Sequence, residues 1–269
     1  MRSDEDKLKE IYEEAVRYLH DIKPVEITDG QLEKYFQVHD IYKEKNRILK
    51  RLCGSLQNYQ SMPNVIGFYT KEERAEGFRK VLFNYDETKI LDAYASYEKL
   101  RDAFAREFDI NKSNFERKNN SWTKYSKAVL SACVFMKQFK NADDFNTFVG
   151  LFSYNEVTRV ALPLLLEREI YGLGFALACD FLKEIGYSQY PKPDVHLIGI
   201  FHALGLCEDN QLSCYKAIIK MANATRETPF KVDKVFWMIG SGNFNSDYYE
   251  GEIKPRRDNF IKHMKALGF

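Results

Sequence analysis

The sequence predicts an all-α protein. Apolar residues recur at helical spacing along almost the whole chain, and no segment alternates apolar and polar residues as a half-buried strand does. Prolines, glycines and capping residues interrupt this pattern at intervals that fit the ends of helices. With 269 residues and a hydrophobic content of 45%, the chain is long enough for one large domain or two small ones.

A series of helices is predicted in the first half of the chain. The first runs from Asp4 to Ile22 and ends before Pro24, because the residue preceding a proline disfavours helical dihedral angles. Thr28 is a suitable N-cap for a second helix that reaches toward Arg51. Beyond the break at Met62-Pro63, helices are predicted at 71–83, 86–95 and 97–108, and the alanine-rich segment 122–139 is predicted to be a central buried helix.

The second half continues with shorter helices. Segments 143–149 and 154–161 come first, and Pro163 fits the first turn of the next helix, where its missing N–H costs nothing. A tight connection at 170–174 leads into a helix at 175–185, for which Gly186 is a suitable left-handed C-cap. Asp194 is predicted to cap the following helix, and the last helices are expected at 212–222, 231–239 and 256–267, with a turn at 241–243.

Charge is unevenly distributed along the chain. The formal net charge is +1, yet residues 1–40 carry six bases against eleven acids, so the remainder has an excess of positive charge. Basic and aromatic residues are interleaved at 43–51, 112–127 and 254–265. Such clusters suit contact with a phosphate backbone. Solvated helix faces have the same composition and are the alternative interpretation.

Composition also gives expectations about the cellular location of the protein and about metal binding. No apolar stretch approaches the ~20 residues of a membrane span, and the acidic start differs from a signal peptide, so we expect a cytoplasmic protein without a membrane partner. The five cysteines are odd in number and mostly lie in apolar helical patterns, which indicates reduced thiols. Cys207 and Cys214 are spaced loosely like metal ligands. No further cysteine follows them, so we expect no metal site.

Segment 170–195 carries the clearest chemical signal. Gly172-Leu173-Gly174 allows a tight turn that brings backbone N–H groups to the surface at a helix N-terminus, where they favour an anion such as a DNA phosphate. A helix connection without a ligand is the alternative. Pro191 and Pro193 hold the next segment extended. As an N-cap, Asp194 can give one oxygen to an amide near His196 and present the other to a ligand.

The combination of Gly172-Leu173-Gly174 with Asp194-Val195-His196 resembles the helix-hairpin-helix DNA glycosylase superfamily, the base-excision repair enzymes typified by endonuclease III and the 8-oxoguanine and alkyl-base glycosylases. The likeness covers roughly residues 47 to 206. It implies two helical subdomains with a cleft between them, one at 46–203 and one formed by 1–45 and 204–269. It also implies a nucleoid-associated monomer that acts on double-stranded DNA carrying a modified base and needs no cofactor.

The resemblance also assigns roles to residues. Asp194 is the expected catalytic carboxylate, which stabilises positive charge on the deoxyribose while the bond to a flipped base breaks and helps deprotonate water. Gln57 is expected to fill the gap in the base stack, with a simple polar helix end as the alternative. Further DNA contacts are expected from Gly172, Gly174, Phe175, Lys192 and His196, and the base pocket from Tyr59, Trp122, Trp237 and Phe244.

Two positions depart from the family pattern. Bifunctional members carry a Schiff-base lysine two residues after the second hairpin glycine, where this chain has Ala176. Because only an amine can form the imine needed for strand cleavage, a monofunctional glycosylase is expected. The alternative is a lyase that uses Lys192, which lies two residues before Asp194 on a segment predicted to be extended and would therefore point to the same side. Pro193 stands where many relatives have an aliphatic residue. A non-catalytic protein that binds distorted DNA, and a protein with no DNA role, are the remaining alternatives.

Overall fold

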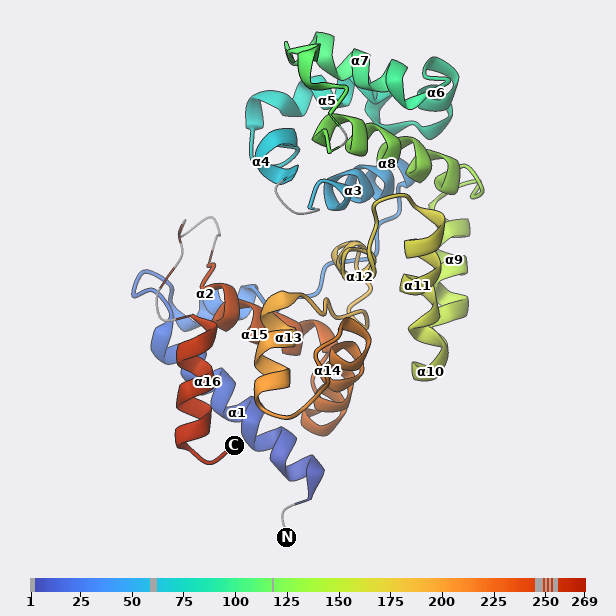
Figure 1. Ribbon diagram of the computed structural model, residues 1–269. Coiled ribbons are helices and arrows are strands. Elements are labelled where there is room, and N and C mark those ends of the chain that lie inside the picture. Colours follow the sequence, from blue (N-terminus) through green and yellow to red (C-terminus); the bar gives the residue numbers. More distant parts are fainter. Residues whose placement is uncertain are drawn as a thin grey trace. The chain divides into compact units, whose positions relative to one another are not determined.

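The computed structural model describes residues 3–58, 62–117, 119–244, 249, 251, 253 and 256–269. Every regular element in this part of the chain is a helix, which confirms the predicted all-α class (Figure 1). No described helix has both the length and the apolar character needed to cross a membrane.

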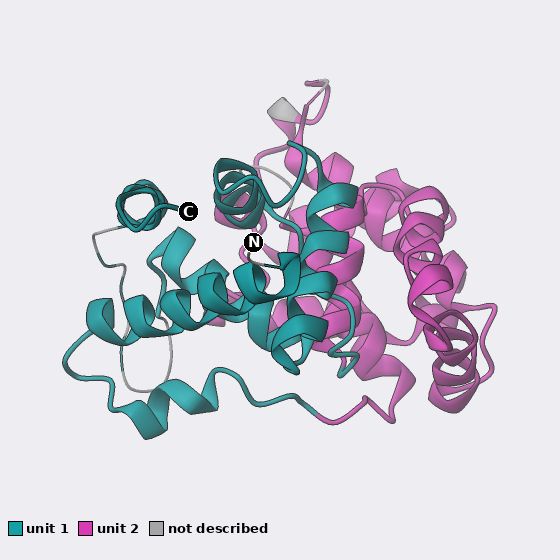
Figure 2. Ribbon diagram, turned by 90° about the horizontal axis from the view of Figure 1, so that it is seen from below, with its two compact units in different colours: residues 1–39, 186–269 teal, residues 40–185 magenta. Residues whose placement is uncertain are grey.

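The chain forms two compact units. Unit 1 consists of Met1–His39 and Gly186–Phe269, and unit 2 of Asp40–Ile185, so unit 2 is inserted into the chain of unit 1 (Figure 2). The family resemblance placed the second boundary after residue 203. In the structure residues 186–203 belong to unit 1, because the helix that they contain packs against three other helices of that unit. Asp194 therefore lies in unit 1, and Gly172 and Gly174 lie in unit 2.

Unit 1 is built around one helix, α15 (Pro229–Ser241). Its residues Val232, Val235, Phe236 and Ile239 are fully buried and follow the i, i+3, i+4, i+7 spacing of a helix face turned to a core. The helices in contact with it are α1 (Asp4–Ile22), α13 (Val195–Ala203), α14 (Gln211–Thr225) and α16 (Arg257–Ala266). The sequence predicted α1, α14 and α16 within a few residues, and for α13 it predicted the N-cap, Asp194.

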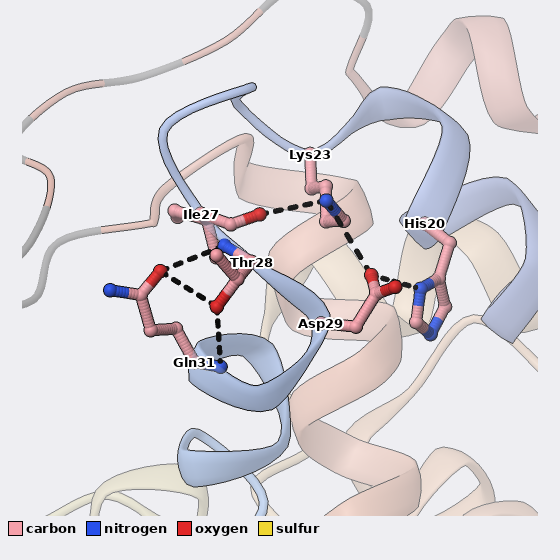
Figure 3. Close-up of polar contacts among 6 residues, drawn as sticks. All are labelled: His20, Lys23, Ile27, Thr28, Asp29 and Gln31. Carbon is pink, nitrogen blue, oxygen red and sulfur yellow. Dashed lines mark hydrogen bonds and ion pairs between the residues drawn. The ribbon is translucent and has the colours of Figure 1, made fainter.

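A short helix, α2 (Asp29–Lys34), follows α1, and polar contacts fix the turn between them (Figure 3). Thr28 caps α2 as predicted: Gln31 N donates to Thr28 Oγ1 at 3.3 Å, and Thr28 N donates to Gln31 Oε1 at 2.8 Å, which forms a capping box. Asp29 Oδ1 lies 3.0 Å from His20 Nδ1. This hydrogen bond lowers the pKa of Asp29.

The continuous helix predicted from Thr28 toward Arg51 is wrong. The structure has α2, then an irregular segment, then α3 (Lys45–Leu56). Two tertiary hydrogen bonds replace the helical ones: the Tyr35 hydroxyl donates to the carbonyl of Phe244, and Tyr42 N donates to Ile185 O at 3.2 Å. Helix propensity cannot anticipate partners so distant in the sequence.

Unit 2 surrounds the predicted central helix, α8 (Ser121–Met136), which contacts α3, α4 (Met62–Ile66), α6 (Glu87–Ala93) and α7 (Tyr97–Glu107) (Figure 1). The segment predicted as a helix at 71–83 begins as a 3-10 turn and is α-helical at Ala75–Val81 (α5). The other helices of unit 2 are α9 (Ala142–Ser153), α10 (Glu156–Arg159), α11 (Ala161–Glu169) and α12 (Phe175–Glu184).

A buried ion pair joins α3 to α12 in unit 2. The Nη2 atom of Arg51 lies 3.1 Å from Asp180 Oδ2 and 4.0 Å from Glu184 Oε2. The side chains of Arg51 and Asp180 are 17% and 8% exposed, so water screens their attraction far less than at the surface. Lys183 Nζ lies 3.9 Å from the other Asp180 oxygen.

We predict that Arg51→Met lowers the free energy of unfolding by about 3 kcal/mol, because it leaves the buried Asp180 carboxylate without its nearer cation. Arg79→Met is the matched control, since Arg79 and its partner Glu76 are mostly exposed, and it should cost less than about 1 kcal/mol. Urea denaturation followed by circular dichroism measures both. Similar losses in the two variants would contradict a special role for the buried pair.

Candidate functional site

The connection between α11 and α12 is held by α8 of the same unit. Gly172 has φ +78°, in the left-handed region that favours glycine, so the chain reverses there without strain. Ser131 of α8 uses its hydroxyl twice: it accepts from Tyr171 N at 2.9 Å and donates to Glu169 O at 3.3 Å. Leu173 N donates to Ile170 O at 3.1 Å and closes the turn. These three hydrogen bonds therefore fix the turn.

Gly174 is the N-cap of α12 and brings no capping side chain. A Cβ added there would meet no atom within 4 Å, so the space over this helix end is open. The first amides of a helix have no partner within the helix and carry the positive end of its dipole. The start of α12 thus has the backbone arrangement predicted for an anion site.

A cavity of about 350 Å³ adjoins this turn. One wall is formed by 171–174, and the other lining residues come from α3, α4, α8 and α11: Leu56, Met62, Lys124, Ala128 and Glu167. The lining is mostly apolar and includes one cationic and one anionic side chain. The turn therefore borders a hollow that a ligand group can enter.

Asp194 is the N-cap of α13 in unit 1, as the sequence predicts. Its Oδ1 accepts from His196 N at 2.9 Å and from Leu197 N at 3.3 Å. Its Oδ2 has no hydrogen-bond partner among the described residues, and the side chain is half-buried. One carboxylate oxygen thus caps the helix, and the other makes no hydrogen bond to a described residue.

The segment before Asp194 is fastened to α15. Lys192 N donates to Asp233 Oδ2 at 2.7 Å, and Phe230 N donates to Ser188 O at 3.0 Å. Asp233 is fully buried in the middle of α15. The sequence predicts an extended strand from Lys192 to Asp194, whereas Asp194 N donates to Lys192 O at 2.9 Å. This is a three-residue γ-turn about Pro193. The alternating side-chain direction of an extended strand, which would place Lys192 and Asp194 on the same side, therefore does not apply.

A glycine lets α13 approach α15 closely. A Cβ added to Gly240 would lie 2.8 Å from the Cβ of His196 and 3.4 Å from Ile200 Cδ1. Because the Cβ of His196 is bonded directly to the backbone of α13, no side-chain rotation could relieve this clash. His196 itself is half-buried and gives its backbone N–H to Asp194. The packing of α13 on α15 thereby helps set the position of the Asp194 carboxylate.

Gln57, predicted to enter the base stack, has another role in the structure. It is the C-cap of α3 and only 2% exposed, and its Oε1 accepts from Phe68 N at 2.8 Å. The side chain thus binds the backbone of the segment just after α4. This arrangement corresponds to the alternative interpretation, a polar helix end, and corrects the expected DNA contact.

Two of the four expected base-pocket aromatics, Trp122 and Phe244, are buried in the protein core. Trp122 is buried among Phe78, Phe104 and Phe108, with ring centroids 6.3, 5.4 and 5.6 Å away. Phe244 is fully buried in the core of unit 1. Trp237 is partly buried against the same core, with Lys234 Nζ 5.3 Å from its ring centroid. Tyr59 lies outside the described residues. Trp122 and Phe244 are therefore core residues, which corrects the expectation.

Part of the predicted basic surface is internal. In the cluster at 43–51, Lys45 and Arg51 have side chains that are 15% and 17% exposed, and each faces an acid. Lys45 Nζ lies 2.6 Å from Glu87 Oε1 and also donates to the carbonyl of Phe139. These two cations neutralise buried carboxylates of unit 2. They cannot also track a phosphate backbone in this conformation.

Three residues of the candidate site were not predicted from the sequence. Asp233, Gly240 and Ser131 act by holding backbone, and none belongs to the motifs that were singled out. Asp233 had a usable signal, because it is an acid inside the apolar helical pattern of Val232 to Phe236. Across the described residues, no group of three or more His, Cys, Asp and Glu side chains could hold a metal ion.

We predict that Gly240→Ala lowers the free energy of unfolding by about 2 kcal/mol, because the added methyl group overpacks the contact between α15 and α13. The control is Gly150→Ala in α9, where no atom lies within 4 Å of the added Cβ and the higher helix propensity of alanine should raise stability by up to about 1 kcal/mol. Denaturant unfolding of both variants is the measurement. A neutral Gly240→Ala variant would show that α13 adjusts freely.

Comparison of the chain with protein-family models, with curated proteins and with solved structures gives no match.

Proposed function

We propose that this protein is a DNA glycosylase, which hydrolyses the N-glycosidic bond of a damaged or mispaired base flipped out of duplex DNA. The observation that carries the proposal is the Asp194 carboxylate, with one oxygen fixed at the start of α13 and the other without a hydrogen-bond partner among the described residues. The resemblance of Gly172-Leu173-Gly174 and Asp194-Val195-His196 to the helix-hairpin-helix glycosylases supplies the reaction class.

In this proposal, α11, the turn at 170–174 and α12 form a helix-hairpin-helix motif that binds one DNA phosphate. The uncapped start of α12 supports this role, because amides such as those of Ala176 and Leu177 can donate to phosphate oxygens. Open space above Gly174 allows the DNA backbone to come close. Such contacts position the duplex and carry no information about the base.

Asp194 would act on the sugar of the flipped nucleotide. As the glycosidic bond stretches, positive charge develops on the deoxyribose, and a fixed carboxylate oxygen nearby stabilises that charge more than it stabilises the ground state. The same oxygen can then accept a proton from the attacking water. The two hydrogen bonds from His196 N and Leu197 N keep the carboxylate from rotating, so little reorganisation accompanies the reaction.

The proposed enzyme is monofunctional. Ala176 occupies the position of the family's Schiff-base lysine and has no amine. Lys192 is the alternative amine, and its backbone N–H is bound to the buried Asp233. The γ-turn at Pro193 removes the extended geometry on which that alternative depended. Water is therefore the proposed nucleophile, and the product is an abasic site with an intact strand.

We predict that Asp194→Asn lowers the rate of base release about 100-fold or more, because the amide keeps the helix cap but has no charge to stabilise the sugar cation. Duplexes carrying 8-oxoguanine, uracil, hypoxanthine or an alkylated base are assayed with alkali, which cleaves at abasic sites. Asp21→Asn, which removes an exposed acid of α1, is the control and should leave the rate unchanged.

Binding to the same duplexes separates the alternatives. Retained affinity with lost base release supports a catalytic role for Asp194. Salt-dependent binding with no base release by the wild-type protein would favour the non-catalytic DNA-binding protein, and weak binding insensitive to salt would exclude a DNA role. Equal base release by wild type and Asp194→Asn would refute the mechanism.

We also predict that borohydride does not crosslink the wild-type protein to an abasic duplex, because trapping requires an imine between a protein amine and the opened sugar. Lys192→Ala should behave in the same way as the wild type in this assay. Denaturing electrophoresis of the reduced mixture is the measurement. A trapped complex that disappears in Lys192→Ala would establish the lyase alternative.

A further inference from the structure

We propose that unit 2 carries a binding site for a small organic cation, in a cavity lined by α9, α11 and the end of α8 (Figure 1). The ligand class is an alkylated ammonium ion, in which methyl or methylene groups surround the positive charge. The lining of this cavity shares no residue with the cavity beside the turn at 170–174, and the proposal does not depend on the glycosylase activity.

The cavity has a volume of about 460 Å³, which lies in the range of small-molecule pockets. Its apolar lining comes from three parts of unit 2. Phe135 lies in the last turn of α8 and Phe139 follows that helix, Phe148 and Leu151 lie on α9, and Leu165 lies on α11. These side chains give the cavity an apolar wall.

The three phenylalanines of this wall pack on one another. The ring centroid of Phe148 lies 5.1 Å from that of Phe139 and 6.3 Å from that of Phe135. Phe135 and Phe139 are buried, whereas Phe148 is half-buried, so more of its ring is accessible. The face of an aromatic ring attracts a cation. Phe148 is therefore the aromatic residue that we expect to contact the ligand.

The charged residues of the lining are acidic. Asp144 and Glu169 line the cavity, and no described residue of the lining is a lysine or an arginine. Asp144 Oδ2 accepts from Lys140 N at 2.9 Å, which holds this carboxylate at the start of α9. Lys137, Lys140 and Arg168 are exposed neighbours in the sequence and lie outside the described lining. Two carboxylates without a base in the described lining favour a positively charged ligand.

The helix ends add to this preference. The cavity adjoins the last turns of α8 and α11, where the helix dipole is negative. The end of α8 already binds a cation of the chain itself, because Lys45 Nζ donates to the carbonyl of Phe139. The positive end of α9 also lies here, but Asp143 and Asp144 in its first turn offset it. The charges around the cavity therefore favour a cation.

The lining also indicates the kind of cation. Calcium and magnesium need six or more oxygen ligands, and no group of three or more His, Cys, Asp and Glu side chains in the described part of the chain could hold a metal ion. A primary ammonium is strongly hydrated and gains little from an apolar wall. An ammonium surrounded by methyl groups can contact the wall and the carboxylates together. This combination points to an alkylated ammonium ion.

The test uses choline as the probe and 3,3-dimethylbutan-1-ol as its neutral isostere, which has a carbon atom in place of the nitrogen. Titration calorimetry of the full chain should give a Kd for choline that is lower than that of the isostere by about tenfold or more. Equal affinities would overturn the proposal. So would an absence of choline binding at ~10 mM, where a ligand with a Kd of ~1 mM is mostly bound.

Two variants test the carboxylates. Glu169→Gln and Asp144→Asn keep the size of the side chain and remove one charge each, so each should raise the Kd of choline about threefold and leave that of the isostere unchanged. Asp143→Asn is the matched control, because Asp143 is exposed, lies next to Asp144 on α9 and is outside the described lining. The same loss in the control as in Asp144→Asn would show that only the net charge matters, and would overturn the site.

Phe148→Leu tests the ring. Leucine keeps an apolar side chain but has no π face, so choline should bind more weakly while the isostere binds as before. Unchanged binding of the isostere shows that the variant is folded and that the cavity is intact. Choline binding that is unaffected by Phe148→Leu, or a folded variant that loses both ligands alike, would contradict recognition of a cation by this wall.

Discussion

Lys192 supplies the only backbone N–H in the sequence Pro191-Lys192-Pro193, and the buried carboxylate of Asp233 accepts it at 2.7 Å. This hydrogen bond ties the segment before α13 to α15. Two prolines limit the dihedral angles on either side, and the γ-turn at Pro193 delivers Asp194 to the helix start. The geometry of the candidate carboxylate thus depends on an acid that takes no part in the proposed reaction.

Much of the fold could be predicted because local residue patterns determine where many of its helices begin and end. The bounds of α1 and α12 follow from proline and glycine residues, the start of α13 follows from its capping residue, and α8 follows from its alanine-rich apolar pattern. The break in the long helix predicted after Thr28 could not be predicted, because Tyr35 and Tyr42 form hydrogen bonds with residues far along the chain. Local propensity determines a helix only where tertiary contacts do not compete with it.

In the candidate site, too, the local features were predicted and the features that depend on tertiary packing were not. The cap at Asp194 and the glycine turn at Gly172 are local features, and the sequence identified them. Burial depends on tertiary packing and not on local sequence, which explains why the aromatic residues were misassigned. Trp122 and Phe244 are of a residue type that can stack on a base, but both are buried in the core. The same holds for charge. Arg51 and Lys45 count toward a basic cluster in the sequence, whereas in the fold they balance Asp180 and Glu87 inside unit 2.

The hydrogen bond from Tyr42 N to Ile185 O joins residues at the two ends of the inserted unit. Unit 1 can form only when Met1–His39 meets Gly186–Phe269, which closes a loop as long as the whole of unit 2. The entropy cost of closure rises with loop length. Once unit 2 has folded and its ends are bonded, the effective loop shrinks to the few residues at its entrance and exit. A chain synthesised from its N-terminus completes unit 2 first, so this bond makes the order of synthesis a favourable order of folding.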